Sequence, residues 1–179
     1  MSFEERIEEI YNNHEVKPYI SPERDLGKWL LEGKPVPKRN MIVLENGLLP
    51  GDIILLWRIN FGSFETTTPY SKYFEYTYGI DGPSHMQQLI NNGYVYVESA
   101  FDSLDHITAI VKKQILKDQG ISGLSKMKSA DLDVALRTYV TEETLGSYFS
   151  VRGYALTEKG EEALRNHPEV IDRHPKKKL

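Results

Sequence analysis

The chain has 179 residues, 40% of them hydrophobic, which is enough to bury a core in one domain or in two small ones. It contains no cysteine, which excludes disulfides, thiolate metal sites and cysteine nucleophiles and favours a cytoplasmic protein. The formal net charge of -4 argues against a strongly basic nucleic-acid binder. The longest apolar run, Ile53–Trp57, is too short to span a membrane, and the acidic N-terminus does not resemble a secretory signal.

Positive charge is concentrated in the second half of the chain. Residues 1–100 hold 9 Lys and Arg against 14 Asp and Glu, whereas residues 101–179 hold 13 against 12. Within residues 112–137, six cationic side chains outnumber three acidic ones. Because affinity for phosphate comes mostly from Lys and Arg, a phosphate-binding surface is expected here. Its candidate residues are Lys112, Lys113, Lys117, Lys126, Lys128 and Arg137.

The N-terminal part predicts two helices followed by a proline-rich connector. Ser2 is a suitable cap for a helix that extends to about Asn13, and Ser21-Pro22 predicts a second helix that stops near Gly33. The connector that follows predicts one short strand, Met41–Leu44. We therefore expect two regions, an N-terminal helical region of residues 1–47 and a helical domain of residues 48–179.

The next elements in chain order suggest a helical core with a little sheet. Pro50-Gly51-Asp52 begins an apolar helix that ends near Ile59 and lacks a polar side, which predicts a buried position. Thr68-Pro69 opens a helix rich in aromatic residues. A third helix, from about Pro83 to Asn91, is followed by an alternating strand, Tyr94–Glu98, as in the wing of winged-helix proteins.

The stretch from Leu104 to Tyr139 predicts two amphipathic helices joined by a short basic loop. Apolar residues of the first are Ile107, Ile110, Val111, Ile115 and Leu116, and those of the second are Leu132, Val134, Leu136 and Tyr139. After it we expect a helix capped by Thr141, a strand that ends at Leu156 and pairs with the earlier strand, and a helix capped by Thr157. The basic tail, Arg173–Lys178, is expected to fray. The fold class is mainly α with a small β component, that is, α+β.

Motifs of catalysis and metal binding are missing from this sequence. It has no Walker loop, no HExxH and no calcium loop, and its five histidines are scattered. Asp102, Asp105 and His106 lie together, and we interpret them as a helix start capped by Ser103 rather than as a carboxylate–histidine pair. No catalytic residue, metal site or cofactor is predicted, and the protein is expected not to be an enzyme.

The segment LKDQGISGLSKMKSADLDVAL resembles the SAP motif, a short DNA-binding helix–loop–helix. Leu116-Lys117, Gly120-Ile121, Leu132 and Leu136 match that pattern. Met127, Ser129 and Ala135 stand where the family usually has glycine, lysine and arginine. The order of the segments PGDIILLW, YFEYTYGID, LINNGYV and YALTEKGEEAL is similar to bacterial and prophage proteins that carry a SAP domain, so the resemblance covers about Leu48 to His174.

The resemblance implies nucleic-acid binding and adds to what the charge pattern indicates. Our leading hypothesis is weak DNA binding, little dependent on sequence, through the six cationic residues named above. The alternative is a protein-interaction module that docks a partner with the same helical pair, and a hydrolytic enzyme comes third. The oligomeric state stays open.

Overall fold

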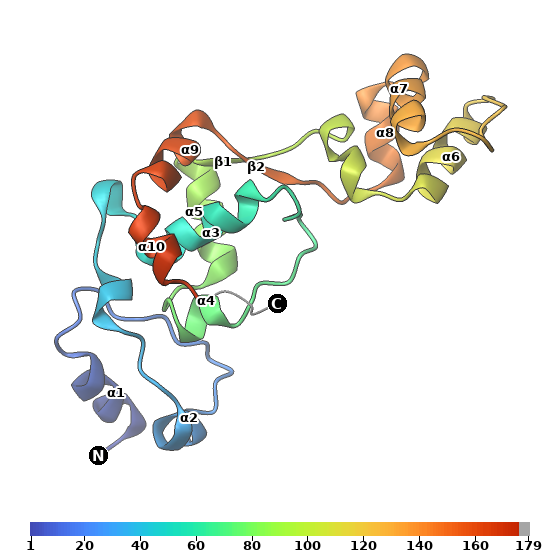
Figure 1. Cartoon of the computed structure of the whole chain (residues 1–179). Coiled ribbons are helices and arrows are strands. Elements are labelled where there is room, and N and C mark those ends of the chain that lie inside the picture. The colour runs from blue at the N-terminus through green and yellow to red at the C-terminus, as the bar shows by residue number, and fades with distance from the viewer. Residues whose placement is uncertain (176–179) are drawn as a thin grey trace. The chain divides into compact units, whose positions relative to one another are not determined.

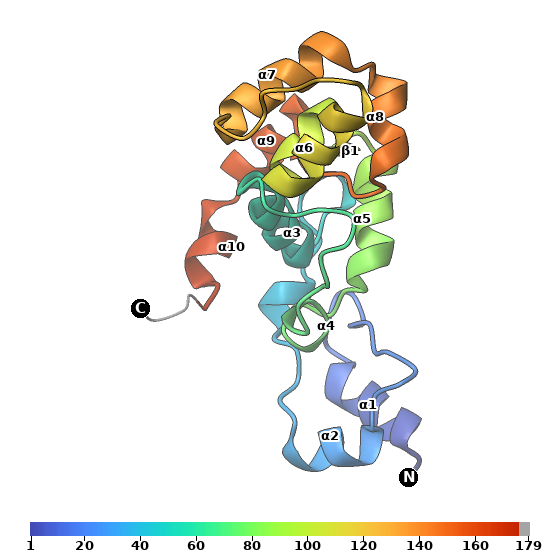
Figure 2. The same ribbon diagram turned by 90° about the vertical axis from the view of Figure 1, so that its right-hand side faces the viewer.

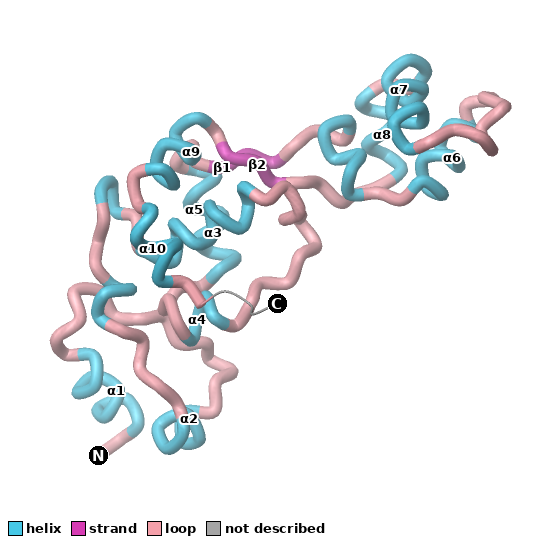
Figure 3. Tube along the Cα trace, in the orientation of Figure 1, coloured by secondary structure: helices cyan, strands magenta, loops and turns pink. Residues whose placement is uncertain are grey.

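The computed structural model describes residues 1–175, which are mainly helical with one two-stranded sheet (Figures 1 and 3). This agrees with the predicted fold class. The α-helices are α1 (Phe3–Tyr11), α2 (Leu26–Glu32), α3 (Pro50–Asn60), α4 (Tyr73–Tyr76), α5 (Gly82–Asn91), α6 (Ala109–Asp118), α7 (Ser129–Tyr139), α8 (Glu142–Tyr148), α9 (Glu158–Arg165) and α10 (Pro168–Arg173). The strands are β1 (Val95–Val97) and β2 (Tyr154–Leu156). Short 3-10 helices cover Lys38–Met41, Glu45–Gly47 and Phe101–His106. Within the described residues, no helix combines the length and the apolar character needed to cross a membrane.

The chain divides into two compact units that interleave along the sequence. Unit 1 contains Met1–Asn60, Pro69–Val95 and the residues from Leu156 onward. Unit 2 contains Phe61–Thr68 and Tyr96–Ala155. The predicted helix–loop–helix of residues 104–139 lies entirely within unit 2, so its contacts can be described from that unit alone.

Helix α3 is the centre of unit 1, as its uniformly apolar sequence predicts. It contacts α5, α9 and α10, and Figure 2 shows it between α5 and α10. Ile53, Ile54 and Leu55 are fully buried. The one acid of the helix, Asp52, is also buried, and its carboxylate accepts a hydrogen bond from the backbone N–H of Leu49 at 2.8 Å. The helix start is therefore capped from within, which satisfies a polar group in the core.

The first 47 residues belong to unit 1, so the predicted boundary at residue 47 does not coincide with a division in the structure. The backbone N–H of Tyr19 donates to the Gly79 carbonyl at 2.7 Å. The amide of Asn40 donates to the Thr77 carbonyl at 2.9 Å. Because such long-range hydrogen bonds leave no local sequence pattern, the proline-rich connector predicts a boundary that the structure does not have.

Two predicted elements in this region were wrong. Helix α2 begins at Leu26 with Asp25 as its cap, because the Asp25 carboxylate accepts from the backbone N–H of Lys28, and it does not begin at Ser21-Pro22. The predicted strand Met41–Leu44 is replaced by the 3-10 helix Lys38–Met41, in which the Met41 side chain is fully buried. In both places a capping or packing contact outweighs the local propensity.

Strands β1 and β2 pair with each other, as predicted. Directly after β2, Thr157 caps helix α9 by accepting a hydrogen bond from the backbone N–H of Gly160 at 3.1 Å. The backbone N–H of Thr157 itself donates to the Tyr94 carbonyl at 3.0 Å. A Cβ added to Gly160 would lie 2.1 Å from that same carbonyl oxygen. The first turn of α9, from Thr157 to Gly160, therefore lies directly against the backbone of Tyr94.

Helix α10 and the residue after it were not predicted. His174 is buried, and its Nδ1 is hydrogen-bonded to the hydroxyl of Tyr78 at 2.6 Å. The expectation of a frayed tail is wrong for Arg173 and His174, because one ends a helix and the other enters an aromatic cluster. The remaining tail lysines of that prediction, Lys176–Lys178, lie outside the described residues.

Burial in this cluster predicts a loss of stability at alkaline pH. Burial, and secondarily the neighbouring Tyr73, raises the pKa of Tyr78 to about 12, whereas Arg173 and Arg39 act to lower it. A tyrosine whose folded pKa is raised stabilises the protein fully below its unfolded pKa, and this contribution is lost as pH rises from about 10 to 12. Urea unfolding at neutral pH and at about pH 11 should show a decrease of roughly 1 to 2 kcal/mol. The variant Tyr78→Phe should show a smaller decrease, and an equal one would contradict the assignment to Tyr78.

Candidate nucleic-acid interface

The core of unit 2 is built by the helical pair and by helix α8. Besides Ala100, its fully buried side chains come from α6, α7 and α8, and they are Ile115, Leu116, Leu132, Leu136 and Leu145. The carboxylate of Glu142, in the first turn of α8, accepts hydrogen bonds from the backbone N–H groups of Ala100 and Phe101. Helices α6 and α7 contact each other directly. The predicted pair of amphipathic helices is thus present and rests on a shared core.

Helix α6 ends in the way that its Gly-Ile sequence implies. Gly120 has a φ of 80°, in the left-handed region that favours glycine. The N–H of Ile121 donates to the Leu116 carbonyl at 3.1 Å, and the N–H of Gly120 donates to the Lys117 carbonyl at 3.0 Å. These two bonds form a Schellman motif, which satisfies carbonyls at the helix end and turns the chain sharply. The direction of the following loop is therefore fixed from its first residue.

The loop between α6 and α7, residues 119–128, is drawn in pink in Figure 3, and its apolar side chains pack against the core. Ile121, Leu124 and Met127 are partly buried and pack on the core of unit 2. They recur at every third position, whereas Lys126 and Lys128 are exposed. The anchored apolar residues reduce the conformational entropy that the loop would lose on binding. Its lysines are therefore already held in position before a ligand binds.

Lys112 does not lie where the sequence interpretation put it. Its side chain is only 3% exposed, and its ammonium pairs with Asp133 of α7 at 2.7 Å. It also donates to the hydroxyl of Ser129 at 3.0 Å. Lys112 precedes Ile115 and Leu116 by three and four positions, so it occupies the buried stripe of α6. This lysine links the two helices and is not available to a phosphate.

The remaining lysines keep their charge free for a ligand. Lys117, Lys126 and Lys128 are exposed, and Lys113 is half-buried. Within residues 1–175 none of the four forms an ion pair with a carboxylate. Lys128 directly precedes α7, where its backbone N–H donates to the carboxylate of Asp131 at 3.1 Å. The cationic set is therefore smaller than predicted, with four lysines in place of five.

The Arg137 side chain already interacts with other residues of unit 2. Its guanidinium lies 3.6 Å from the carboxylate of Asp102, donates to the Phe101 carbonyl at 3.3 Å and lies over the Phe101 ring at 5.3 Å. More than half of the side chain is still exposed. Because exposed ion pairs of this kind contribute little free energy, a phosphate could compete with Asp102.

Three apolar residues predicted to face the core are instead exposed. Ile110 is 81% exposed, Val134 is 65% exposed and Tyr139 is 60% exposed. They come from α6 and α7, the same two helices that carry the lysines. Single exposed apolar residues are common on protein surfaces. Three of them on one helical pair nonetheless keep the protein-interaction alternative open.

The acidic cluster near His106 has a structural explanation. The Nδ1 of His106 lies 2.6 Å from the carboxylate of Glu65, which accepts its hydrogen. Burial raises the pKa of the nearby Glu98, with Asp105 acting in the same direction. Ser103 does not cap a helix as predicted, because its hydroxyl donates to the Ser99 carbonyl and accepts from the Gly153 N–H. In the part of the chain described here, no group of three His, Asp or Glu residues is arranged to hold a metal ion.

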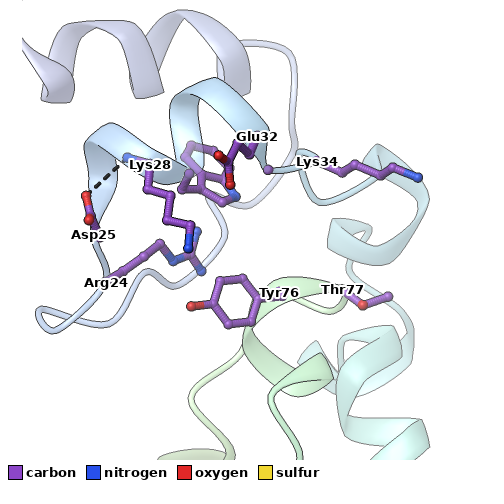
Figure 4. Close-up of a pocket in the computed structure, with 9 residues that line it drawn as sticks. Arg24, Asp25, Lys28, Glu32, Lys34, Tyr76 and Thr77 are labelled. Carbon is purple, nitrogen blue, oxygen red and sulfur yellow. Dashed lines mark hydrogen bonds between the residues drawn. The ribbon is translucent and has the colours of Figure 1, made fainter.

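A cavity of about 500 Å³ in unit 1 was not predicted (Figure 4). The guanidinium of Arg24 lies 4.5 Å from the ring of Tyr76 and 5.1 Å from that of Trp29, and it pairs with Glu75. In Figure 4, Arg24 and Lys28 extend toward Tyr76, whereas Lys34 points away. Since Arg24 is neutralised and Asp25 and Glu32 also line the cavity, its charges are mixed. It does not select a ligand by charge.

Comparisons of this chain with protein-family models, with curated proteins and with solved structures found no match.

Proposed function

We propose that the chain is a non-enzymatic, DNA-binding accessory protein of the cytoplasm that contacts phosphates through its SAP-like helix–loop–helix. The contacting residues are Lys113, Lys117, Lys126 and Lys128, with Arg137 at the edge of the set. The observation that carries the proposal is a group of exposed or half-buried lysines, on a well-anchored loop and helix end, that form no ion pair with a carboxylate within residues 1–175. Lysine contacts to phosphate supply affinity but carry no base information, so binding is weak and largely independent of sequence.

The number of contacts sets the salt dependence. Four phosphate contacts predict a slope of about -3.6 for log affinity against log salt concentration on double-stranded DNA. Between about 50 and 200 mM salt, the affinity should therefore fall by roughly 100-fold. Fluorescence anisotropy with a labelled duplex of random sequence measures this slope, and a second duplex of unrelated sequence should give nearly the same affinity.

The double variant Lys126→Glu with Lys128→Glu should lower DNA affinity by about 10-fold or more at low salt, because it replaces two phosphate contacts by two repulsions. Both side chains are exposed, so the melting temperature should change little. Lys34→Glu with Lys38→Glu, in unit 1, makes the same change in net charge at exposed lysines and serves as the matched control. Equal losses in the two double variants would contradict a specific role for unit 2.

A protein-interaction module is the second candidate function, favoured by the exposure of Ile110 and Val134. It uses the same helical pair, with apolar contacts in place of phosphate contacts. The anisotropy experiment separates the two candidates. A complete lack of DNA binding at low salt would remove the first and leave the second.

A further inference from the structure

Unit 1 contains a second cavity, larger than the one in Figure 4. Its volume is about 650 Å³. It lies between α3, α4 and the chain after α10, and its lining includes Trp57, Arg58, Ser71, Tyr73, Thr77 and His174. Cavities of roughly 300 to 1,000 Å³ are typical of sites for small molecules. The DNA contacts proposed above use none of these residues.

The walls of this cavity are aromatic side chains that pack against one another. The rings of Tyr73 and His174 have centroids 4.8 Å apart, and those of Trp57 and His174 are 5.4 Å apart, both edge to face. The Tyr78 ring stacks on His174 with centroids 5.6 Å apart, and its hydroxyl is hydrogen-bonded to Nδ1. Such packing fixes the ring planes in advance, which favours a flat ligand that can lie against them.

The polar groups of the cavity are mainly hydrogen-bond donors. The Nη1 of Arg58 lies 3.4 Å from the Tyr73 hydroxyl, a long contact that leaves most of its N–H groups available. Ser71 and Thr77, which also line the cavity, each carry a hydroxyl group. Burial raises the pKa of Tyr73, so its hydroxyl keeps its hydrogen at neutral pH. A guanidinium with several hydroxyl donors suits an anionic group with several acceptor oxygens.

The electrostatic surroundings strengthen this preference. Arg39 and Arg173 act on the adjacent Tyr78 and lower its pKa, against the dominant effect of burial. Among residues 1–175, none of Arg39, Arg58 and Arg173 forms an ion pair with a carboxylate. No acidic residue of the described chain lines the cavity. The lining that the structure describes therefore holds one arginine, Arg58, and no carboxylate, which favours an anionic ligand although the chain has a net charge of -4.

We propose that this cavity binds a small planar aromatic molecule carrying a phosphate or carboxylate group. The anionic group binds Arg58, and the ring lies against Trp57 and Tyr73. The cavity of Figure 4 is not a comparable candidate, because Glu75 neutralises its arginine and Asp25 and Glu32 line it.

Isothermal titration of the full chain with four probes tests the proposal. Adenosine 5′-monophosphate and indole-3-acetate carry both a ring and an anion, and they distinguish a phosphate from a carboxylate. Adenosine and inorganic phosphate carry one feature each. We expect at least one of the first two to bind about 10-fold more tightly than either partial probe, because both parts of the cavity contribute. No binding of either complete probe at millimolar concentration, or equal binding by a partial probe, overturns the proposal.

Variants locate the binding in this cavity. Arg58→Gln should lower the affinity for the probe that carries both a ring and an anion by roughly 10- to 100-fold, because a charge-assisted hydrogen bond to the anion is lost. Arg6→Gln removes an exposed arginine of helix α1 and should leave the affinity unchanged. If Arg58→Gln does not fold, Ser71→Ala tests the same site, because Ser71 lines only this cavity whereas Thr77 also lines the cavity of Figure 4, and it should weaken binding about 3-fold or more. Unchanged affinity in a folded cavity variant overturns the assignment. The DNA test uses variants of unit 2, so the two proposals fail independently.

Discussion

Replacing Gly160 with alanine is expected to lower the free energy of unfolding by about 3 kcal/mol. The new Cβ would lie 2.1 Å from the Tyr94 carbonyl oxygen, a backbone atom that cannot rotate away. Relief requires the start of α9 to move, which would weaken the capping bond from Gly160 to Thr157 and the bond from Thr157 to Tyr94. In an uncrowded helix the same substitution would stabilise the protein by roughly 0.5 to 1 kcal/mol, so even the sign of the effect reports on the contact.

Thermal and urea unfolding of the variant measure this effect. Glu161→Ala, at the neighbouring exposed position of α9, is the control and should change stability by less than about 0.5 kcal/mol. A Gly160→Ala variant as stable as the natural chain would show that α9 does not approach Tyr94 as closely as described here.

The second large effect concerns the two partners Lys112 and Asp133, whose removal should have unequal consequences. Asp133→Ala leaves an ammonium that is 3% exposed with Ser129 as its main partner, and it should cost about 2 kcal/mol. This is below the cost for a fully buried pair, because Asp133 is 37% exposed and water screens part of the interaction. Lys112→Met keeps the aliphatic stem in the core and leaves Asp133 to be hydrated, so it should cost less than about 1 kcal/mol.

DNA affinity provides an independent test of Lys112. Because its ammonium is turned toward α7, Lys112→Met should change the affinity by less than about 2-fold. Loss of an exposed lysine, as in Lys126→Met, should reduce both the affinity and the salt slope, the slope by about 1. If the two variants weakened DNA binding equally, Lys112 would have to reach the phosphates and its buried position would be contradicted.

The elements that could be predicted from sequence are those with strong local signals. Ser2, Thr141 and Thr157 each cap the helix expected after them, since a side-chain oxygen near three free backbone N–H groups is a local device. The end of α6 at Gly120 and the burial of α3 follow in the same way from one glycine and one apolar run. These features depend on neighbours within four residues, which periodicity and capping rules cover.

The errors came from contacts between distant segments. Charge counting treated Lys112 as a surface residue, although its spacing of three and four from Ile115 and Leu116 was a signal that it shares their buried side. The partner that makes its burial tolerable, Asp133, lies on the next helix, and no local rule pairs the two. The opposite error concerns Ile110, which is apolar but exposed. Residue type alone does not determine which side of a helix the rest of the protein covers.

The aromatic cavity was also beyond reach of the sequence. Its lining comes from three segments, around Arg58, Tyr73 and His174, which lie far apart along the chain. Of the aromatic residues near Tyr73, Phe74 and Tyr78 are buried in the core. Tyr73 lines the cavity beside Arg58 because of where α10 ends. This helix was not predicted.

The interleaving of the two units affects the order in which a nascent chain can fold. All residues of unit 2 lie between Phe61 and Ala155, so this unit is completely synthesised before the first residue of α9. Unit 1 begins earlier, but α3 has to wait for α9 and α10, which cover it. During translation, which proceeds from the N-terminus, the apolar surface of α3 therefore stays incompletely covered while unit 2 is already able to close its core. Unit 1, whose first residues leave the ribosome first, is thus the unit that completes its core last.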